Sequence, residues 1–132
     1  MGEAGAPCWF ELHTTDFAAA VPFYEKVFGW TATSIGDTDE FRMVVFGQEG
    51  AAGAGILDSS HRGSRPGEPP GSQWMVYLAV ADADAAASQV TANGGTVFDG
   101  PNDTPFGRMS WAADSTGALF ALMQLPDRAA AG

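Results

Sequence analysis

The sequence has one cysteine, six basic residues and no long apolar run in its 132 residues. Because Cys8 cannot form a disulfide within the chain, the composition favours a cytoplasmic setting. The first eight residues, MGEAGAPC, have no basic flank and no apolar segment, so they do not resemble a signal peptide. No stretch is apolar over the length needed to cross a bilayer. A formal net charge of −10 disfavours nucleic acid and anionic membranes as partners, since both would be repelled.

The residues that are plentiful indicate one globular domain rich in turns. Hydrophobic residues make up 45% of the chain and aromatic residues 11%, which is enough for a modest core. The 17 glycines and eight prolines favour many turns, and therefore a fold rich in β-structure.

A strand is expected near the start of the chain, with two different faces. Trp9, Glu11 and His13 alternate with Phe10 and Leu12, so the period of two places the first three side chains on one face. The Phe10 and Leu12 face suits packing against a helix. A carboxylate and an imidazole are costly in a sealed core, so the other face is expected to line a solvated cleft.

A helix is expected to follow, with Asp16 as its N-cap and Gly29 at its C-terminal end. The apolar stripe of this helix is Phe17, Ala20, Val21, Tyr24, Val27 and Phe28. Pro22 lies inside it, where it removes a backbone donor. We therefore expect a kink or a loose first turn.

The two halves of the chain match at an offset of 66 residues. The matched pairs are Asp16 with Asp82, Gly29 with Gly95, and Arg42-Met43 with Arg108-Met109. Each half reads as a strand, a helix and three strands. One such unit leaves a sheet face uncovered, so two copies are expected to pair.

The expected boundaries follow from composition. Residues 7–57 form the first module and residues 73–126 the second. Between them, residues 58–72 are rich in Gly, Pro and Ser and are read as a linker or flap. Within the second module, residues 96–98 are expected to be a short strand and residues 100–106 a loop.

Three segments resemble the vicinal oxygen chelate superfamily, which includes glyoxalase I, bleomycin-resistance proteins and extradiol dioxygenases. They are FYEKVFGW, WMVYLAVADADAAA and DSTGALFALMQ, and the resemblance covers residues 7–126. It implies an α+β fold of two βαβββ modules that form a curled mixed sheet around a central cleft. It also implies a homodimer.

Members that use a metal carry His and Glu ligands on the first and last strands of each module. The resemblance places these four positions at Trp9, Gly55, Met75 and Ala121. None of these side chains supplies the imidazole or carboxylate that a divalent ion prefers. A shift of one residue would turn the side chain to the other face. The sequence therefore predicts no metal and no cofactor.

Glu11 and His13 are the sharpest pair for chemistry. They could act as acid and base, since His titrates near neutrality. The alternative is a hydrogen-bonded pair that orders the strand. Cys8 is read as a small, partly buried residue with no activating motif, and His61 as a solvent-exposed residue of the linker.

An apolar chamber is expected where the metal would lie, because Trp and Tyr offer flat surfaces and Met adapts to irregular shapes. Ordinary core packing is the alternative for each of these residues. The expected ligand-binding residues are Trp9, Met43, Gly55, Met75, Tyr77, Met109, Trp111, Ala121 and Met123. The sequence leaves the register of the 41–46 and 108–113 strands open. Arg42 and Arg108 are either structural or hold an anionic ligand.

Three functions are compatible with these residues. The first is a metal-independent protein that binds a flat apolar or aromatic compound and protects the cell by sequestration. The second is a metal-independent enzyme of the isomerase, lyase or cyclase type, with Glu11 and His13 as acid and base. The third is a metal-dependent lyase or dioxygenase.

Overall fold

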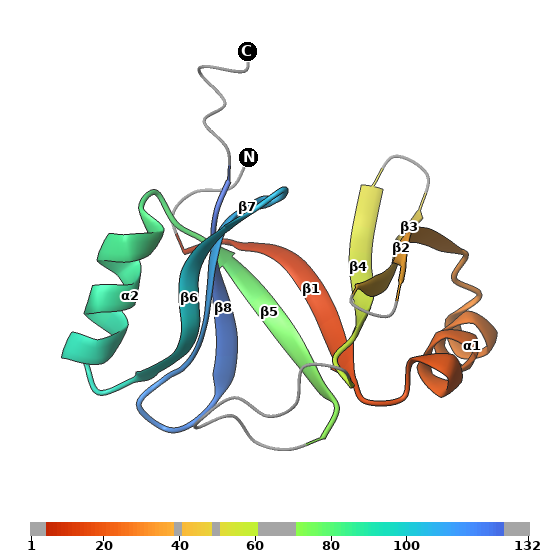
Figure 1. Ribbon diagram of the computed structural model, residues 1–132, viewed down its shortest axis with the longest axis horizontal. Coiled ribbons are helices and arrows are strands. Elements are labelled where there is room, and N and C mark those ends of the chain that lie inside the picture. Colours follow the sequence, from red (N-terminus) through yellow and green to blue (C-terminus); the bar gives the residue numbers. More distant parts are fainter. Residues whose placement is uncertain (1–4, 39–40, 49–50, 61–70, 126–132) are drawn as a thin grey trace, which may run out of the picture. The chain divides into compact units, whose positions relative to one another are not determined.

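The computed structural model describes residues 5–38, 41–48, 51–60 and 71–125, which form two successive β-α-β-β-β modules (Figure 1). The first module consists of β1 (Pro7–Thr14), α1 (Phe17–Phe28), β2 (Ala32–Asp37), β3 (Arg42–Gln48) and β4 (Ala51–Asp58). The second consists of β5 (Gln73–Ala79), α2 (Ala83–Ala92), β6 (Thr96–Thr104), β7 (Gly107–Ala113) and β8 (Leu119–Gln124). The predicted α+β class is confirmed.

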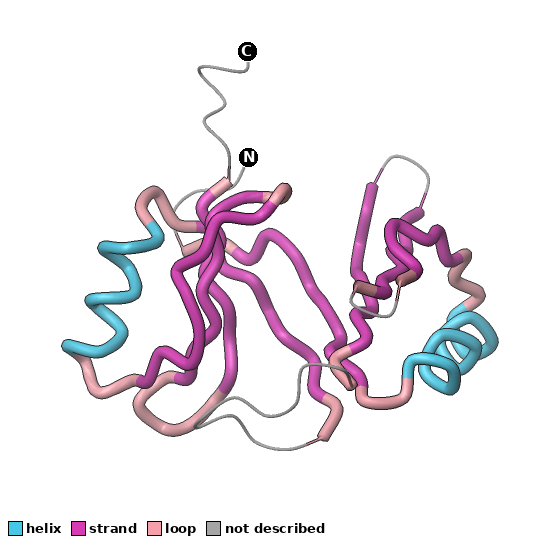
Figure 2. Tube along the Cα trace, viewed as in Figure 1, coloured by secondary structure: helices cyan, strands magenta, loops and turns pink. Residues whose placement is uncertain are grey.

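Each module builds four strands in the same order. The first runs β2-β3-β4-β1 and the second β6-β7-β8-β5. The first and last strands of each module pair in parallel, and the remaining neighbours pair antiparallel. Parallel pairing requires a long connection, and the helix together with the two following strands provides it (Figure 2).

The described residues divide into two compact spatial units. The first unit contains residues 9–60 and 71–75, and the second contains residues 5–8 and 76–125. The division falls within β1 and β5, so spatial unit and sequence module begin at slightly different residues. Of the expected linker, Asp58 belongs to β4 and residues 61–70 lie outside the described residues.

Helix α1 begins and ends where the sequence predicts. Oδ1 of Asp16 accepts a hydrogen bond from the backbone N–H of Ala19 at 3.1 Å. Gly29 has a φ of 70° and its N–H donates to the Glu25 carbonyl at 2.9 Å. That left-handed conformation favours glycine. Helical structure continues through Pro22.

The core of the first unit lies between α1 and its strands. Leu12, Val44, Phe46 and Ile56 are buried there. The partly buried residues that pack against them are Phe17, Ala20, Val21, Tyr24, Trp30 and Ala32. The first four residues of the expected helix stripe, Phe17 to Tyr24, therefore pack on the core, whereas Val27 and Phe28 are 55% and 57% exposed. Phe10, expected on the same strand face as Leu12, is 45% exposed.

An aromatic cluster surrounds Tyr24 at the edge of this core. The Tyr24 ring stacks with Phe28 and Trp30, and Nε1 of Trp74 donates to its hydroxyl at 3.0 Å. Trp74 is 41% exposed and Phe28 57% exposed. Much of this aromatic surface therefore faces solvent.

Helix α2 begins at the predicted cap but ends earlier than its counterpart. Oδ1 of Asp82 accepts from the N–H of Ala85 at 3.1 Å. The helix stops at Ala92, with Asn93 as the C-cap. The sequence Asn93-Gly94-Gly95 therefore ends the helix, and the positive φ occurs at Gly94, where it is 91°, one residue before Gly95, the repeat partner of Gly29.

Strand β6 is longer than the sequence indicates. The loop expected over residues 100–106 is wrong, since β6 continues to Thr104. The ladder to β7 shifts register between Asp99 and Asn102 and then resumes, with Asn102 opposite Met109. Gly100 has a φ of 83°, which permits this irregularity. The glycine and proline that indicated a loop therefore mark a bulge.

The Asp82 cap gives a direct test of the fold. Asp82→Ala removes the acceptor of the Ala85 N–H and should lower the free energy of unfolding by about 1 kcal/mol, whereas Asp82→Ser should retain most of it. Urea denaturation monitored by circular dichroism measures both. Equal stability of Asp82→Ala and the unsubstituted protein would show that the cap contributes nothing.

Candidate functional site

The candidate site residues of the first unit lie on the sheet face opposite α1. Leu12, Val44 and Ile56 point toward the helix, so side chains at alternate positions point away from it. The registers place Glu11 beside Gly55 and Gly55 beside Val45. The next row contains His13, Leu57 and Met43. The sequence left the register of Met43 open, and the structure places it in the same row as His13.

Glu11 and His13 are buried, which differs from the solvated face that the sequence predicts. Glu11 is 6% exposed and His13 is 4% exposed. Nε2 of His13 lies 3.7 Å from Oε2 of Glu11, and Nε1 of Trp9 donates to Oε1 of Glu11 at 3.3 Å. A buried carboxylate is costly unless polar groups approach it. The imidazole and the indole N–H provide such groups.

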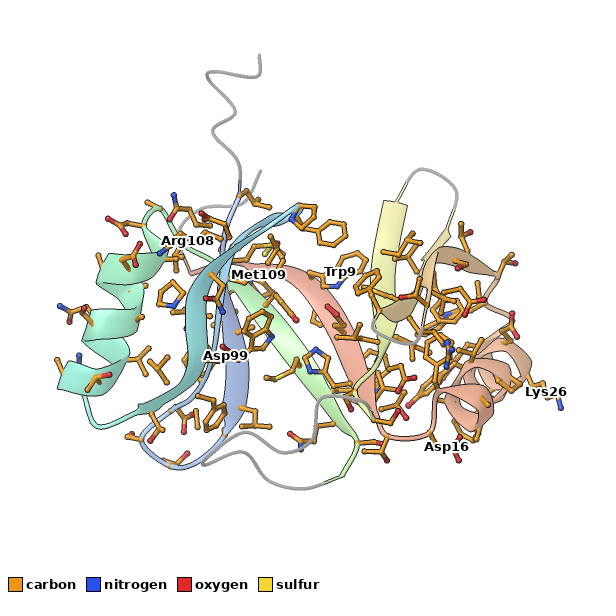
Figure 3. All side chains as sticks on the ribbon, viewed as in Figure 1. Trp9, Asp16, Lys26, Asp99, Arg108 and Met109 are labelled. Carbon is orange, nitrogen blue, oxygen red and sulfur yellow. The ribbon has the colours of Figure 1, made fainter. Side chains whose placement is uncertain are left out.

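The sequence predicted Trp9 as a stacking surface and missed its hydrogen bond to Glu11. Both residues lie on β1, two positions apart and on one face, and that spacing is the signal that could have revealed the contact. Figure 3 labels Trp9 on this strand. Trp9 therefore fixes the carboxylate as well as offering an apolar ring.

Gly55 does not leave open space at the centre of this face. A Cβ atom built there would lie 2.7 Å from Cε of Met43 and 3.0 Å from Cζ2 of Trp9. The expectation of an empty centre at Gly55 is corrected, because these two side chains occupy the space that a larger residue would fill. Met43 can adopt other rotamers readily, so its side chain can move out of the space over Gly55.

The second module repeats this arrangement in register. Tyr77 lies beside Ala121, and Ala121 lies beside Trp111. These positions are 66 residues after Glu11, Gly55 and Val45. Met109, Met123 and Ala79 likewise repeat the row of Met43, Leu57 and His13. The offset found in the sequence therefore holds for the strand registers.

Tyr77 and Trp111 form a hydrogen bond across Ala121. Nε1 of Trp111 donates to the Tyr77 hydroxyl at 3.0 Å. The two residues stand on the strands either side of β8, which are about 10 Å apart since neighbouring strands are spaced by nearly 5 Å. Their rings can meet across β8 because Ala121 is small. Tyr77 is 1% exposed and Ala121 is fully buried.

Buried methionines occupy the neighbouring row of the second unit. Met109 is 6% exposed and Met123 is 7% exposed, and Figure 3 labels Met109 on β7. Met75, which the division places in the first unit, is 1% exposed. These residues are core-like in burial, and their thioether side chains are adaptable.

Cys8, which belongs to the second unit, lies close to Tyr77 and Met123. Its Sγ lies 3.4 Å from the Tyr77 carbonyl oxygen and 3.9 Å from Sδ of Met123. Burial raises the pKa of the Cys8 thiol above its usual value, which disfavours the nucleophilic thiolate. This supports the interpretation of Cys8 as a packing residue. His61 lies outside the described residues.

Arg42 and Arg108 occupy equivalent positions and hold carboxylates. Nε of Arg42 donates to Asp37 at 2.9 Å, and Nη1 of Arg108 donates to Asp103 at 2.9 Å. Asp103 lies 66 residues after Asp37. The structural role of these arginines is supported over that of an anion site.

Arg108 also ties β7 to α2 (Figure 3). It donates to both carboxylate oxygens of Asp84, at 2.9 and 3.0 Å. These hydrogen bonds hold the pKa of Asp84 below its usual value. This second pairing has no counterpart in the sequence repeat, since the residue 66 positions before Asp84 is Ala18.

The residues at the four positions where a metal-using member carries ligands do not fit a divalent ion. Trp9, Gly55 and Ala121 supply no ligand atom, and Met75 supplies a thioether, which suits soft ions. Among the described residues there is no group of three or more His, Cys, Asp or Glu side chains that could hold a metal ion. Metal independence stays a prediction.

A family model of the Glyoxalase/Bleomycin resistance protein/Dioxygenase superfamily matches residues 8–122. The chain belongs to this superfamily. The resemblance identified in the sequence is confirmed, and the strand registers described above give its two modules the same construction.

Two curated relatives come from Streptomyces and Mycobacterium species. The anthracycline biosynthesis protein DauV of Streptomyces sp. (strain C5) is 39% identical over 127 residues, which cover 89% of this chain and 46% of the relative. The putative glyoxylase CFP32 of Mycobacterium tuberculosis is 35% identical over 126 residues, covering 91% and 46%. The chain thus spans about half the length of these relatives.

Solved structures support the superfamily fold. A methylmalonyl-CoA epimerase in complex with methylmalonyl-CoA is 20% identical, with a TM-score of 0.62 over 95% of this chain and 97% of the other. A hypothetical protein of Bacillus halodurans has a TM-score of 0.65 at 11% identity, covering 95% and 97%. At these identities the likeness shows the fold alone.

No helix in the described part of the chain is long and apolar enough to span a membrane.

The packing of Met43 over Gly55 can be tested by substitution. Gly55→Ala should lower the free energy of unfolding by about 1–3 kcal/mol, because the new methyl group overlaps Cε of Met43. In the double variant Gly55→Ala/Met43→Ala the overlap with Met43 is gone. Its loss of unfolding free energy should therefore be smaller than the sum of the losses in the two single variants, by at least about 0.5 kcal/mol. Chemical denaturation of the four proteins measures this coupling. Strict additivity would contradict the contact.

Proposed function

We propose that this protein binds a flat, largely apolar aromatic molecule without a metal ion. The observation that carries the proposal is a construction shared by both modules. A small residue at the centre of the helix-free face, Gly55 or Ala121, lies beneath large flat or flexible side chains. Such side chains offer stacking surfaces and can repack around a ligand.

The names of the relatives narrow the class of ligand. Two of them are called anthracycline biosynthesis proteins, each 39% identical to this chain. Anthracyclines contain a fused quinone ring system that is flat and mostly apolar. We therefore propose aromatic polyketides of the anthraquinone type as ligands, and sequestration or self-resistance as the role.

The setting of this activity is also a proposal. The single cysteine favours the cytoplasm. The formal net charge of −10 disfavours nucleic acid and anionic membranes as partners. Membership of the superfamily supports a homodimer.

Binding is tested by titration of anthraquinones against tryptophan fluorescence. Trp9→Leu and Trp111→Leu each remove a ring from the proposed faces, and loss of stacking should weaken binding about tenfold where that ring contacts the ligand. Trp74→Leu, which alters the aromatic cluster on α1, is the matched control and should leave the dissociation constant unchanged.

The same titration tests metal independence. Binding should persist after dialysis against a chelator, and elemental analysis of the purified protein should find no stoichiometric zinc, iron or manganese. A ligand affinity that disappears with the metal, or the absence of binding to any planar aromatic compound, would refute the proposal.

A metal-independent enzyme is the second candidate, and one observation favours it. Glu11 and His13 are buried together, with the imidazole nitrogen 3.7 Å from the carboxylate. Such a pair can move a proton on a carbonyl-containing substrate of the same aromatic class. The reaction would be an isomerisation, elimination or cyclisation.

Variants of this pair separate the two candidates. For an enzyme, Glu11→Gln and His13→Ala should each lower kcat by about 100-fold or more, because general acid-base catalysis contributes that much, while ligand binding is largely retained. Product formation from a polyketide substrate, followed by mass spectrometry, measures this. Turnover that is unaffected in both variants would exclude the assigned roles.

A further inference from the structure

We infer that Glu11 accepts a hydrogen bond from a hydroxyl group carried by the bound aromatic molecule, so that the protein selects phenolic or enolic compounds over those without a donor. This inference rests on the proposed function and names the substrate class more closely. Its starting point is the hydrogen-bonding capacity of the Glu11 carboxylate.

The carboxylate has acceptor sites that the described residues leave unused. An ionised carboxylate offers about four lone-pair sites. Within the described residues, Oε1 of Glu11 accepts from the indole of Trp9 at 3.3 Å. The imidazole Nε2 of His13 lies 3.7 Å from Oε2, which is too far for a hydrogen bond. A further donor can therefore be accommodated at Oε2.

The unused acceptor site of Glu11 matters for binding because the residue is buried. The residue is 6% exposed, so a ligand that covers it takes the carboxylate out of contact with water, and a buried acceptor without a donor costs free energy. A ligand that brings a donor to Oε2 avoids that cost, whereas a ligand without a donor incurs it. Discrimination between the two kinds of ligand follows.

The proposed approach to Glu11 lies beside Gly55. The two residues are neighbours in the β1–β4 ladder, and Gly55 has no side chain to block the approach. The methyl group of Met43 and the edge of the Trp9 ring occupy that space. Because Met43 is unbranched and flexible, a flat ligand can displace its end and lie on Trp9 with one ring edge toward Glu11.

The charge of the group that meets Glu11 is also constrained. An anionic group would be repelled by the carboxylate and by the net charge of −10. An ammonium group would need to be desolvated on an apolar face, which is costly. A neutral hydroxyl on the aromatic ring donates a hydrogen bond to the carboxylate with neither penalty, and such charge-assisted bonds are strong.

The experiment compares 2-hydroxyanthraquinone with its methyl ether and with unsubstituted anthraquinone, at mildly acidic pH where the phenol is neutral. Fluorescence titration of the full chain should give an affinity about 10–100-fold higher for the hydroxyl compound than for the ether, the range expected for a hydrogen bond to a charged group. Glu11→Gln should reduce this ratio about tenfold, since a neutral acceptor bonds more weakly.

Two further variants make the assignment specific. Glu11→Asp keeps the charge but withdraws it by one methylene, so it should also lose most of the selectivity. Met43→Leu alters the apolar filling without touching the carboxylate. It should change the affinity for all three compounds by a similar factor and leave the ratio intact.

The outcomes distinguish the aromatic-binding function from the hydroxyl selectivity. If none of the three compounds binds, the proposed function fails and the inference falls with it. If all three bind with equal affinity, the aromatic-binding function stands and the hydroxyl selectivity is overturned. A wild-type ratio that persists in both Glu11→Gln and Glu11→Asp would place the hydroxyl elsewhere and overturn the role of Glu11.

Discussion

Parallel pairing between the first and last strands of each module is the constraint from which the site follows. It places β1 beside β4 and β5 beside β8, so Glu11 lies next to Gly55 and Tyr77 next to Ala121. Antiparallel pairing then adds Val45 and Trp111 to the same rows. Residues distant in the sequence meet on one face because backbone hydrogen bonds fix this register.

The two modules share a backbone plan but differ in chemistry. At equivalent positions, the first carries the carboxylate of Glu11 and the second the phenol of Tyr77. Glu11 is held by Trp9 from its own strand, whereas Tyr77 accepts a hydrogen bond from Trp111 across the small Ala121. The shared backbone plan thus carries a carboxylate in one module and a neutral aromatic face in the other.

Membership of the superfamily does not by itself assign a reaction, because folds host many functions. The side chains at the four positions associated with metal ligands are two small residues, an indole and a thioether. What remains chemically distinctive is a buried carboxylate beside an imidazole, 3.7 Å apart. The proposed binding function uses Glu11 as a recognition group, and the enzyme alternative uses Glu11 and His13 as an acid-base pair.

The sequence by itself determined the features that depend on neighbouring residues. The caps Asp16 and Asp82, the glycine end of α1 and the 66-residue repeat are local or periodic signals, and their physical causes act within a few residues. The absence of imidazole and carboxylate from four positions followed from the resemblance to a family. The bulge in β6 could not be found in this way, because glycine and proline indicate loops equally well.

Only the tertiary structure decided what surrounds each side chain. The burial of Glu11 and His13, the Met43 methyl group above Gly55 and the hydrogen bond from Trp111 to Tyr77 all depend on strands that are far apart in the sequence. Alternation along one strand specifies a face but not the length, rotamer or partner of the side chains that cover it. Those are set by cross-strand packing, which is why the sequence could nominate candidate residues but could not specify their contacts.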